Sequence, residues 1–522
     1  MKRSSTPVQW GRAAVIAALQ VIVFASYAAA QFGGAAPPPA MTQATPLPLS
    51  GRNVQGGGVA ATQSAVPSTT TSVNTLNPTV SVQGAYNGST SSTAQLPFSG
   101  KLSLAEAIQR ALQHNLGAVG SAQALLQARG QARAARSALL PDIRADVNDI
   151  EETFNLRSAG FNFNFPGFSF PTTVGPFNVL DVRARVSQSI ADFTALNNYR
   201  SAREVARAGA LSVKDSQDLV VLAVAGAYLQ VLAANARLDS AQAQLDTAKA
   251  LFERATQQLK FGRATKIDVN RSQIEVLLEQ QRLVTLQNDL AKQKINLARL
   301  TGLPPTAGYE LSNLIPFEPA PPLSLEAAIK QAFAQRSDLK AAETQVRAAE
   351  RALAAARAER FPSASASADY GTIGTPSELR PTFTVSATLN VPIWNGGRTA
   401  ADIQQAQAAL TQRRAELEDT RSQIESEVRN AYLDIEAAAN QVRVAQQNIQ
   451  LMGETLHQTR QRFEAGVSEN VEVVQSQESV AGANLDYIDS VFAHNLAKLS
   501  LARALGNAPS ALAQFLPVQQ RP

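Results

Sequence analysis

The segment Leu102–Asn115, LSLAEAIQRALQHN, returns 221 residues later as Leu323–Arg336, LSLEAAIKQAFAQR. Both copies begin with a serine that can cap a helix, and their apolar residues recur at helical spacing. Further along, the same residue types occur again 204 positions after Tyr228, Gly262 and Gly302. The chain therefore contains a duplicated unit of about two hundred residues, which is far longer than a solenoid repeat.

The duplication sets the expected boundaries along the 522 residues. A join with six prolines separates the copies, and proline is excluded from helix interiors and central strands. We expect a signal peptide at 1–30, a low-complexity, disordered extension at 31–100, a first repeat at 101–302, the Pro-rich join at 303–322, a second repeat at 323–508 and a C-terminal tail at 509–522.

The first thirty residues are typical of an export signal. Lys2, Arg3 and Arg12 precede or flank the apolar run Ala13–Phe24, and Ala28–Ala30 forms a small-residue cleavage site. An uncleaved anchor is the alternative, but the apolar run is shorter than the ~20 residues that a spanning helix needs. The extension at 31–100 is rich in Gly, Pro, Ser, Thr and Gln, and Arg52 is its only charged residue. Such a composition predicts a flexible segment.

Each copy continues in the same order. A helix is expected from the serine cap to just before Pro141 or Pro362, and after it the apolar residues alternate with polar ones. This period of two predicts one strand pair within 143–190 and another within 363–394, four strands in all. In the second pair, Phe383, Val385, Ala387, Leu389, Val391 and Ile393 would share one face.

Long helices are expected to follow each strand pair. Residues 197–262 contain no proline, and Leu238, Leu245, Phe252 and Leu259 recur at sevens. The second copy repeats such a row as Val442, Ile449, Leu456 and Phe463. These rows predict two antiparallel coiled-coil hairpins whose tips lie near residues 262 and 466.

Composition excludes several classes of function. The chain has no Cys, three widely spaced His, and no nucleophile elbow, zinc-protease helix or phosphate loop, so we expect no enzyme, cofactor or metal site. The formal charge of +5 includes Lys2, Arg3 and Arg12 of the leader. The small, dispersed remainder does not favour nucleic acid.

The strand patterns are compatible with two classes of protein. Strands of about ten residues with one apolar face match outer-membrane strands, but four strands cannot close a barrel, so a membrane role requires oligomerisation. The alternative is a non-transport periplasmic or surface coiled-coil protein whose strands form soluble hairpins. Cell fractionation distinguishes the two classes.

Several short motifs resemble the TolC family of outer-membrane efflux proteins. They occur twice and in the same order over residues 101–508, which makes the resemblance specific. The motifs are the LSL openings, the helix end Ala135–Asp142 (ARSALLPD), the strand end Val391–Arg398 (VPIWNGGR), and the tips Phe261–Val269 (FGRATKIDV) and Phe463–Gly466 (FEAG).

The resemblance implies a mainly α protein with a membrane β-barrel. Three chains would close a 12-stranded barrel in the Gram-negative outer membrane and an α-helical coiled-coil tunnel in the periplasm, girdled by an equatorial domain. It implies a passive exit duct of a tripartite efflux or type I secretion system. The partners would be two further copies of the chain, a periplasmic adaptor, an inner-membrane pump of RND, ABC or MFS type, and outer-membrane lipid.

Candidate site residues follow from the strands and the tips. The charged strand residues would face the barrel lumen: Arg144, Asp146, Asp181, Arg183, Arg185 and Asp369. By resemblance, adaptor docking and the entrance fall on Gly262, Arg263, Thr265, Asp268, Phe463, Gly466, Ser468, Glu472 and Gln475. Phe463, Ser468 and Gln475 depart from the family pattern, which puts a closed state held by inter-hairpin links in doubt. We expect Glu472, repeated by symmetry, to form a weak cation-binding ring.

Three further features have structural interpretations. The aromatic run at 161–170 falls in the extra residues of the first copy, where an outward-facing loop is expected. Trp394 would lie at the membrane interface or pack at a strand–helix corner. His494 occupies a heptad position, so we expect it to be packed between helices and not to bind a ligand.

Overall fold

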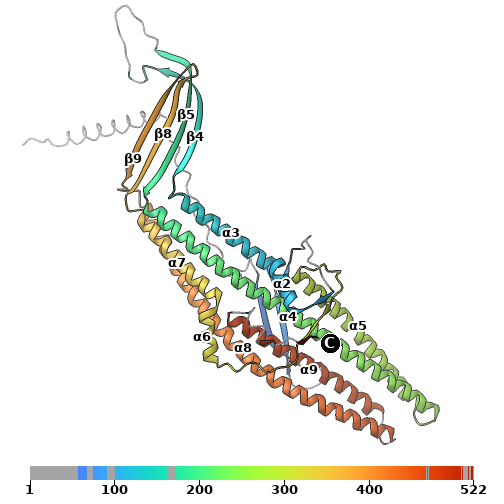
Figure 1. Cartoon of the computed structure of the whole chain (residues 1–522). Coiled ribbons are helices and arrows are strands. Elements are labelled where there is room, and N and C mark those ends of the chain that lie inside the picture. Colours follow the sequence, from blue (N-terminus) through green and yellow to red (C-terminus); the bar gives the residue numbers. More distant parts are fainter. Residues whose placement is uncertain are drawn as a thin grey trace, which may run out of the picture. The chain divides into compact units, whose positions relative to one another are not determined.

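The computed structural model describes residues 57–67, 74–90, 100–158, 160, 172–465, 467, 470–506, 508, 515–516 and 519–520. The signal peptide, the aromatic run at 161–170, Gly466 and Ser468 lie outside the described residues. The described chain is mainly helical and carries a four-stranded antiparallel sheet, as the sequence predicts (Figure 1).

The four-stranded sheet joins the two repeats. Its order is β4-β5-β8-β9, with β4 at Asp142–Asn155, β5 at Thr173–Ala191, β8 at Ser363–Thr375 and β9 at Glu378–Asn390. The central β5–β8 pair connects one copy to the other, and β4 and β9 form the two edges. The second strand pair ends at Asn390, four residues earlier than predicted. Trp394 lies beyond it, 86% exposed, so packing at the strand–helix corner is wrong.

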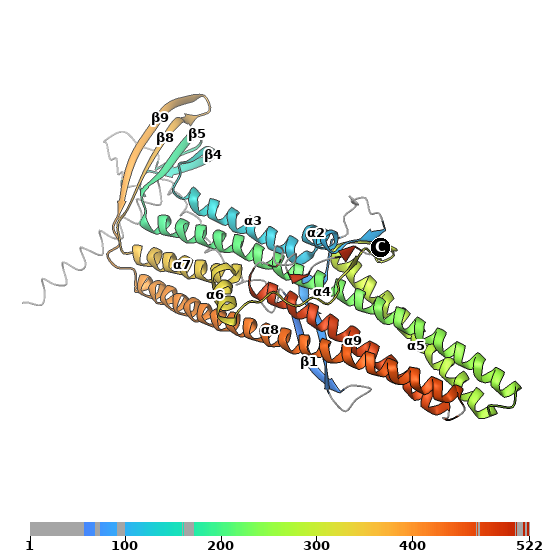
Figure 2. The same cartoon turned by 60° about the horizontal axis from the view of Figure 1, so that its bottom comes forward.

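Each repeat contains two long helices, four in all among the described residues. They are α4 (Phe193–Lys260) and α5 (Lys266–Thr301) in the first copy, and α8 (Arg398–Glu464) and α9 (Asn470–Ala504) in the second. α4 pairs with α5 and α8 pairs with α9, which are the two predicted helical hairpins, and α4 also packs on α9 (Figure 2). Nearer the sheet, α3 (Leu116–Ser137) packs on α4, α4 on α7 (Ser337–Ala358), and α7 on α8.

The expected single helix from each serine cap to proline is wrong, because each is broken once. α2 (Leu104–His114) ends before Asn115 and α6 (Leu325–Gln335) ends before Arg336; both break residues have extended backbones. The Asn115 side chain caps α3 by accepting from Gly117 N–H, while Arg336 is held by Asp338 and Glu427. Tertiary partners therefore stabilise each break. Short strands lie nearby: β3 (Lys101–Leu102), β6 (Glu310–Leu311), β7 (Asn313–Leu314) and β10 (Gln519–Gln520).

The core is centred on the middle of α4. Among the described helices, α4 alone contains a window long and apolar enough to cross a bilayer, with mean hydropathy 1.9, but 78% of that window is buried. Val220 and Tyr228 of α4 are fully buried, and Leu297 of α5 is buried in the same core cluster. The apolar run is thus the packed centre of the helical layer, as in the core helix of a soluble protein.

Part of the segment predicted to be disordered is folded. β1 (Val59–Pro67) and β2 (Asn74–Val82) form an antiparallel hairpin, and a short 3₁₀ helix, η1 (Gly84–Asn87), follows. Val59, Ala61, Val80 and Val82 share one face and pack against the core. The expectation of disorder is therefore wrong for residues 57–67 and 74–90: their alternate small apolar residues bury a face on the helices.

A buried ionic network ties the repeats together. Arg503 on α9 contacts Asp215 on α4, and Arg336 contacts Asp338 at 2.5 Å and Glu427 on α8 at 2.6 Å. Removing one partner of such a buried pair leaves the other charge buried and unpaired, which costs several kcal/mol of stability. The network therefore fixes the position of α9 and the α6–α7 break on α4 and α8.

Asp218 should make stability depend on pH. Burial raises the pKa of this carboxyl from 3.8 to about 6. Because the pKa of Asp218 is higher in the folded state than in the unfolded state, its protonated carboxyl adds to the free energy of unfolding. This stabilisation is fully present below about pH 4 and is lost as pH rises through about 6. Asp218→Asn should therefore be more stable than wild type at pH 8, by up to about 3 kcal/mol, and less so at pH 5. Thermal unfolding followed by circular dichroism measures this; the exposed Asp289→Asn is the matched control. Identical pH dependence of wild type and Asp218→Asn would contradict it.

Candidate functional site

One face of the sheet carries all the charged residues that the sequence assigns to the lumen. Strand register places Arg144 opposite Arg185, Asp146 opposite Arg183, and Arg185 opposite Asp369. Directly paired residues of antiparallel strands point to the same side of a sheet. Asp181 joins them, since it lies two residues before Arg183 on β5.

These side chains form ion pairs along that face. Arg183 contacts Asp181 at 2.5 Å and Asp369 at 3.3 Å, and Arg185 lies 3.5 Å from Asp146. Arg144 instead contacts Asp142 at 2.7 Å. The six predicted residues comprise three arginines and three aspartates, so their charges balance. A surface of this kind holds water without a strong preference for either sign of ion.

The opposite face of the sheet is apolar and uncovered. Ile143 is 71% exposed, Phe383 75% and Val385 76%. Val147, Val182, Val186, Tyr370 and Leu389 are exposed on the same face. An uncovered apolar surface of this extent marks contact with lipid or with another protein, and alternation of polar and apolar residues is typical of outer-membrane strands.

The first helical tip lies between α4 and α5. Gly262 has φ +69°, a conformation that favours glycine, and its N–H donates to the Leu259 carbonyl at 3.0 Å. Thr265 and Asp268 form a reciprocal capping box at the start of α5. Gly262, Arg263 and Thr265 are exposed, so the structure brings these predicted docking residues together on one tip.

The second tip lies between α8 and α9. Phe463 is half-buried, whereas Glu472 and Gln475 are exposed on the first turns of α9. Glu472 lies 3.9 Å from Arg462, so its charge is partly balanced.

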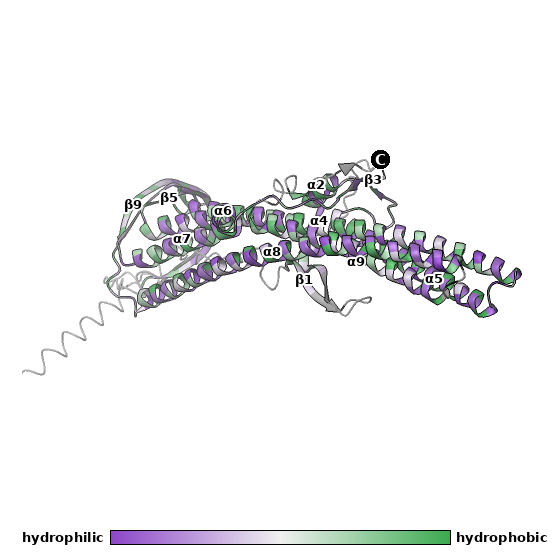
Figure 3. Ribbon diagram, turned by 90° about the horizontal axis from the view of Figure 1, so that it is seen from below, coloured by the Kyte–Doolittle hydropathy of each residue, from purple (hydrophilic) through white to green (hydrophobic). Residues whose placement is uncertain are grey.

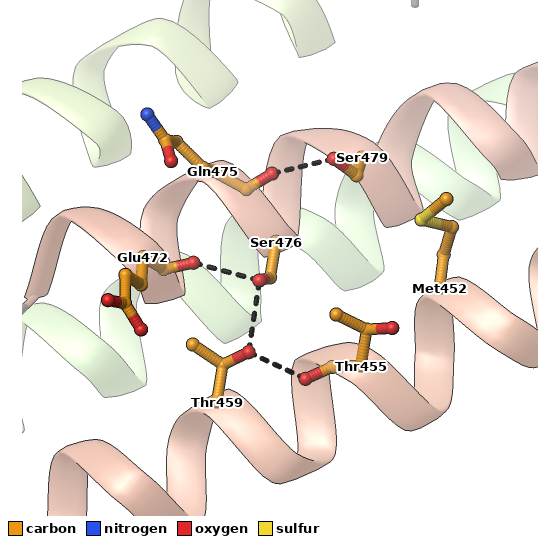
Figure 4. A pocket seen from close by; sticks show the side chains of 7 residues that line it. All are labelled: Met452, Thr455, Thr459, Glu472, Gln475, Ser476 and Ser479. Carbon is orange, nitrogen blue, oxygen red and sulfur yellow. Dashed lines mark hydrogen bonds between the residues drawn. The ribbon is translucent and has the colours of Figure 1, made fainter. Parts of the chain in front are cut away.

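A shallow groove runs along the α8–α9 seam above this tip (Figure 4). Its lining residues are Met452, Thr455, Thr459, Glu472, Gln475, Ser476 and Ser479. Thr459 and Ser476 bridge the two helices, with their hydroxyl oxygens 3.2 Å apart. The Ser476 hydroxyl also donates to the Glu472 carbonyl at 2.8 Å. Small hydroxyl side chains therefore let the helices approach closely at the position of Glu472.

An ion pair links the two helical hairpins near their tips. Arg254 on α4 contacts Glu464 on α8 at 2.6 Å. Neither Arg254 nor Glu464 is among the docking and entrance residues predicted at the tips from the sequence. This pair joins the two hairpins within one chain, and the doubt about a closed state held by such links stays a prediction.

Two buried carboxylates on α5 were also missed. Glu275 and Glu279 are 7% and 4% exposed, and burial together with neighbouring acidic charges raises the pKa of both. Arg282 contacts Glu279 at 2.8 Å. Their spacing of four residues on one helix was the available signal.

His494 is packed, as expected. It is fully buried, its ring centroid lies 4.8 Å from that of Phe317, and burial lowers its pKa to about 4. The imidazole is therefore neutral at physiological pH. Within the described residues no group of three or more acidic, His or Cys side chains could hold a metal ion.

The fold and the two-faced sheet define the class of an outer-membrane channel protein, and comparison with known proteins agrees. Residues 107–303 and 328–507 match the family described as outer membrane efflux protein. The chain belongs to this family. It is an outer-membrane efflux channel of tripartite efflux or secretion systems and not an enzyme.

Individual relatives are distant. The chain is 27% identical to the outer membrane protein OprJ of Pseudomonas aeruginosa, over 63% of this chain and 67% of OprJ. It is 26% identical to the pyoverdine export outer membrane protein OpmQ of Pseudomonas putida, over 76% and 84% of the two chains. The solved structure of VceC from Vibrio cholerae matches with a TM-score of 0.66 at 20% identity, covering 77% of this chain and 96% of VceC.

The two faces of β9 should tolerate charge differently. Val385→Lys places an ammonium on the apolar face, where lipid contact makes it cost about 2–4 kcal/mol near the bilayer centre. Thr384→Lys, one residue away, faces the opposite side and should assemble as wild type does. Outer-membrane yield after fractionation measures the difference. Equal yields of the two variants would contradict the assignment of faces.

Proposed function

We propose that three copies of the chain close a ring that forms a 12-stranded barrel and an α-helical tunnel. The observation that carries this is the open sheet: β4 and β9 are edges, and no described strand pairs with their outer sides. An open edge is not tolerated in lipid, and eight strands are the usual minimum for a barrel. Closure therefore needs further copies of the chain, and the number three is what the resemblance to the TolC family implies.

The helical edges support the same closure. On α5, Ile274, Leu277, Leu278 and Val284 are at least half exposed, and on α8, Leu433, Val444 and Leu451 are about 60% exposed. α5 and α8 are the outermost long helices of the α5–α4–α9–α8 layer. Two different apolar edges on one chain fit a head-to-tail contact, which closes into a ring when the rotation allows.

The ring would act as a passive exit duct. The exposed tip around Gly262 and the exposed Glu472 and Gln475 of the second tip would dock a periplasmic adaptor, and an inner-membrane pump of RND, ABC or MFS type would supply the energy. The relatives' names indicate different cargoes: pyoverdine export for OpmQ, alkaline protease secretion for AprF and cation efflux for CusC. This variety supports a shared conduit whose cargo is selected elsewhere.

Fractionation combined with a semi-native gel tests this function. The duct requires an outer-membrane species that migrates as a trimer without heating and as a single chain after heating. Val385→Lys serves as the assembly-deficient comparison. A soluble periplasmic monomer would instead indicate the non-transport coiled-coil protein.

The proposed cation ring predicts a charge-dependent block. Glu472 repeated three times at the entrance should bind divalent cations weakly, while Arg462 nearby weakens that binding. In planar bilayers, Glu472→Gln should reduce the block of conductance by divalent cations, and Arg462→Gln should increase it. If divalent cations block wild type and Glu472→Gln equally, the proposed cation-binding ring is contradicted.

A further inference from the structure

The β1–β2 hairpin and the short strands around β3 lie on opposite sides of α4. Gly226 faces the hairpin, because a Cβ there would lie 2.7 Å from a methyl group of Val80. Tyr228 faces the other way, where its hydroxyl donates to the Leu102 carbonyl of β3 at 3.1 Å. Residues two apart on a helix point about 200° apart. In Figure 3, likewise, β1 lies on one side of the long helices and α2, α6 and β3 on the other.

The chain crosses the helical layer between these two sides. Residues 86–90 occupy the space between the α2–α3 break and the end of α5. Asn115 donates to the Tyr86 carbonyl at 2.8 Å, Thr90 N–H donates to the His114 carbonyl at 2.8 Å, and the Ser89 hydroxyl donates to the Arg299 carbonyl at 2.5 Å. Tyr86 itself is 2% exposed. Tyr86, Ser89 and Thr90 are therefore held against the helical layer at this point.

Ring geometry decides which side is the lumen. Three copies of four helices at spacings of about 10 Å enclose a circle of about 38 Å between axes, which leaves about 28 Å free inside. The layer with α2, α6 and the short strands contains helices about 10 Å thick. Three copies of it would nearly fill that space, whereas it fits without restriction on the convex outside. The two-stranded hairpin packs mainly on α4 and α9 and covers less of the layer, so it is the body that the narrow inside can more easily hold.

Resting on the trimer of the proposed function, we propose that the β1–β2 hairpin lies in the lumen and forms a collar inside the duct. The face turned away from the helices would contact the cargo. Ala60, Thr62, Ser64, Thr79 and Ser81 are exposed on it, and the Thr62 and Thr79 hydroxyls lie 3.0 Å apart across the strands. No charged residue occurs from 53 to 100. The collar therefore presents hydroxyl groups and small side chains, and it would favour contact with polar solutes of either charge.

Cross-linking across the symmetry axis tests this placement. The chain has no cysteine, so Thr62→Cys introduces a single thiol per protomer. Inside the lumen, three such thiols lie within about 15 Å of one another, whereas on the outside they lie about 50 Å or more apart. A bis-maleimide that spans about 15 Å should therefore yield covalent dimers and trimers of purified Thr62→Cys channels.

Two further variants make the result decisive. Lys330→Cys on the exposed face of α6 should be labelled by a monofunctional maleimide but should not cross-link. Ser81→Cys, on the same hairpin face as Thr62, repeats the test if Thr62→Cys folds poorly. A trimeric channel in which the hairpin thiols are labelled but never cross-linked overturns the collar and leaves the duct intact. A monomeric wild-type protein overturns the trimer itself, and the collar with it.

Discussion

Unpaired backbone groups at the two edges of the sheet constrain the whole molecule. In hydrocarbon no water can satisfy the N–H and C=O groups on the outer sides of β4 and β9. A sheet that exposes Ile143 and Val385 on one face and ion pairs on the other is stable only when those edges pair with other strands. Closure through further copies then places the helical layers side by side. The apolar edges on α5 and α8 suit such packing, so the proposed ring would satisfy the sheet and the helices together.

Each repeat has a helix break at the equivalent position, and the two breaks are stabilised by different interactions. At the break in the first copy, Asn115 caps α3 and binds the backbone at Tyr86, so the N-terminal segment completes the site. In the second copy, Arg336 occupies the equivalent position and is held by Asp338 and Glu427. The equivalent glycines Gly302 and Gly506 both have positive φ, and each lies against its break, beside His114 and Arg336 respectively. The duplicated backbone is thus kept while the side-chain chemistry diverges.

The repetitive parts of the fold were predictable because they depend on local periodicity. Alternation in Phe383–Leu389 and the heptad row from Leu238 to Leu259 are visible in the sequence, and so are the glycines at the tips. The helix breaks were not predictable, because Asn115 and Arg336 acquire their partners only in three dimensions. The β1–β2 hairpin was missed because a polar, low-complexity composition masked the alternation of Val59 and Ala61 with Ala60 and Thr62. The Arg254–Glu464 pair joins residues 210 positions apart, which no local pattern reveals.

Disulfide formation between protomers tests the closure of the ring most directly. Single cysteines across Arg144–Asn148 on β4, combined with single cysteines across Phe383–Ala387 on β9, sample the registers in which one chain could pair with the next. A double variant at Val182 and Thr372, which are directly paired within one chain, shows that oxidation proceeds in the sheet. The ring predicts that at least one β4–β9 combination gives covalent trimers in the outer membrane that reductant returns to single chains. If the Val182–Thr372 pair oxidises but every β4–β9 combination remains unlinked between chains, the edges do not meet and the account is contradicted.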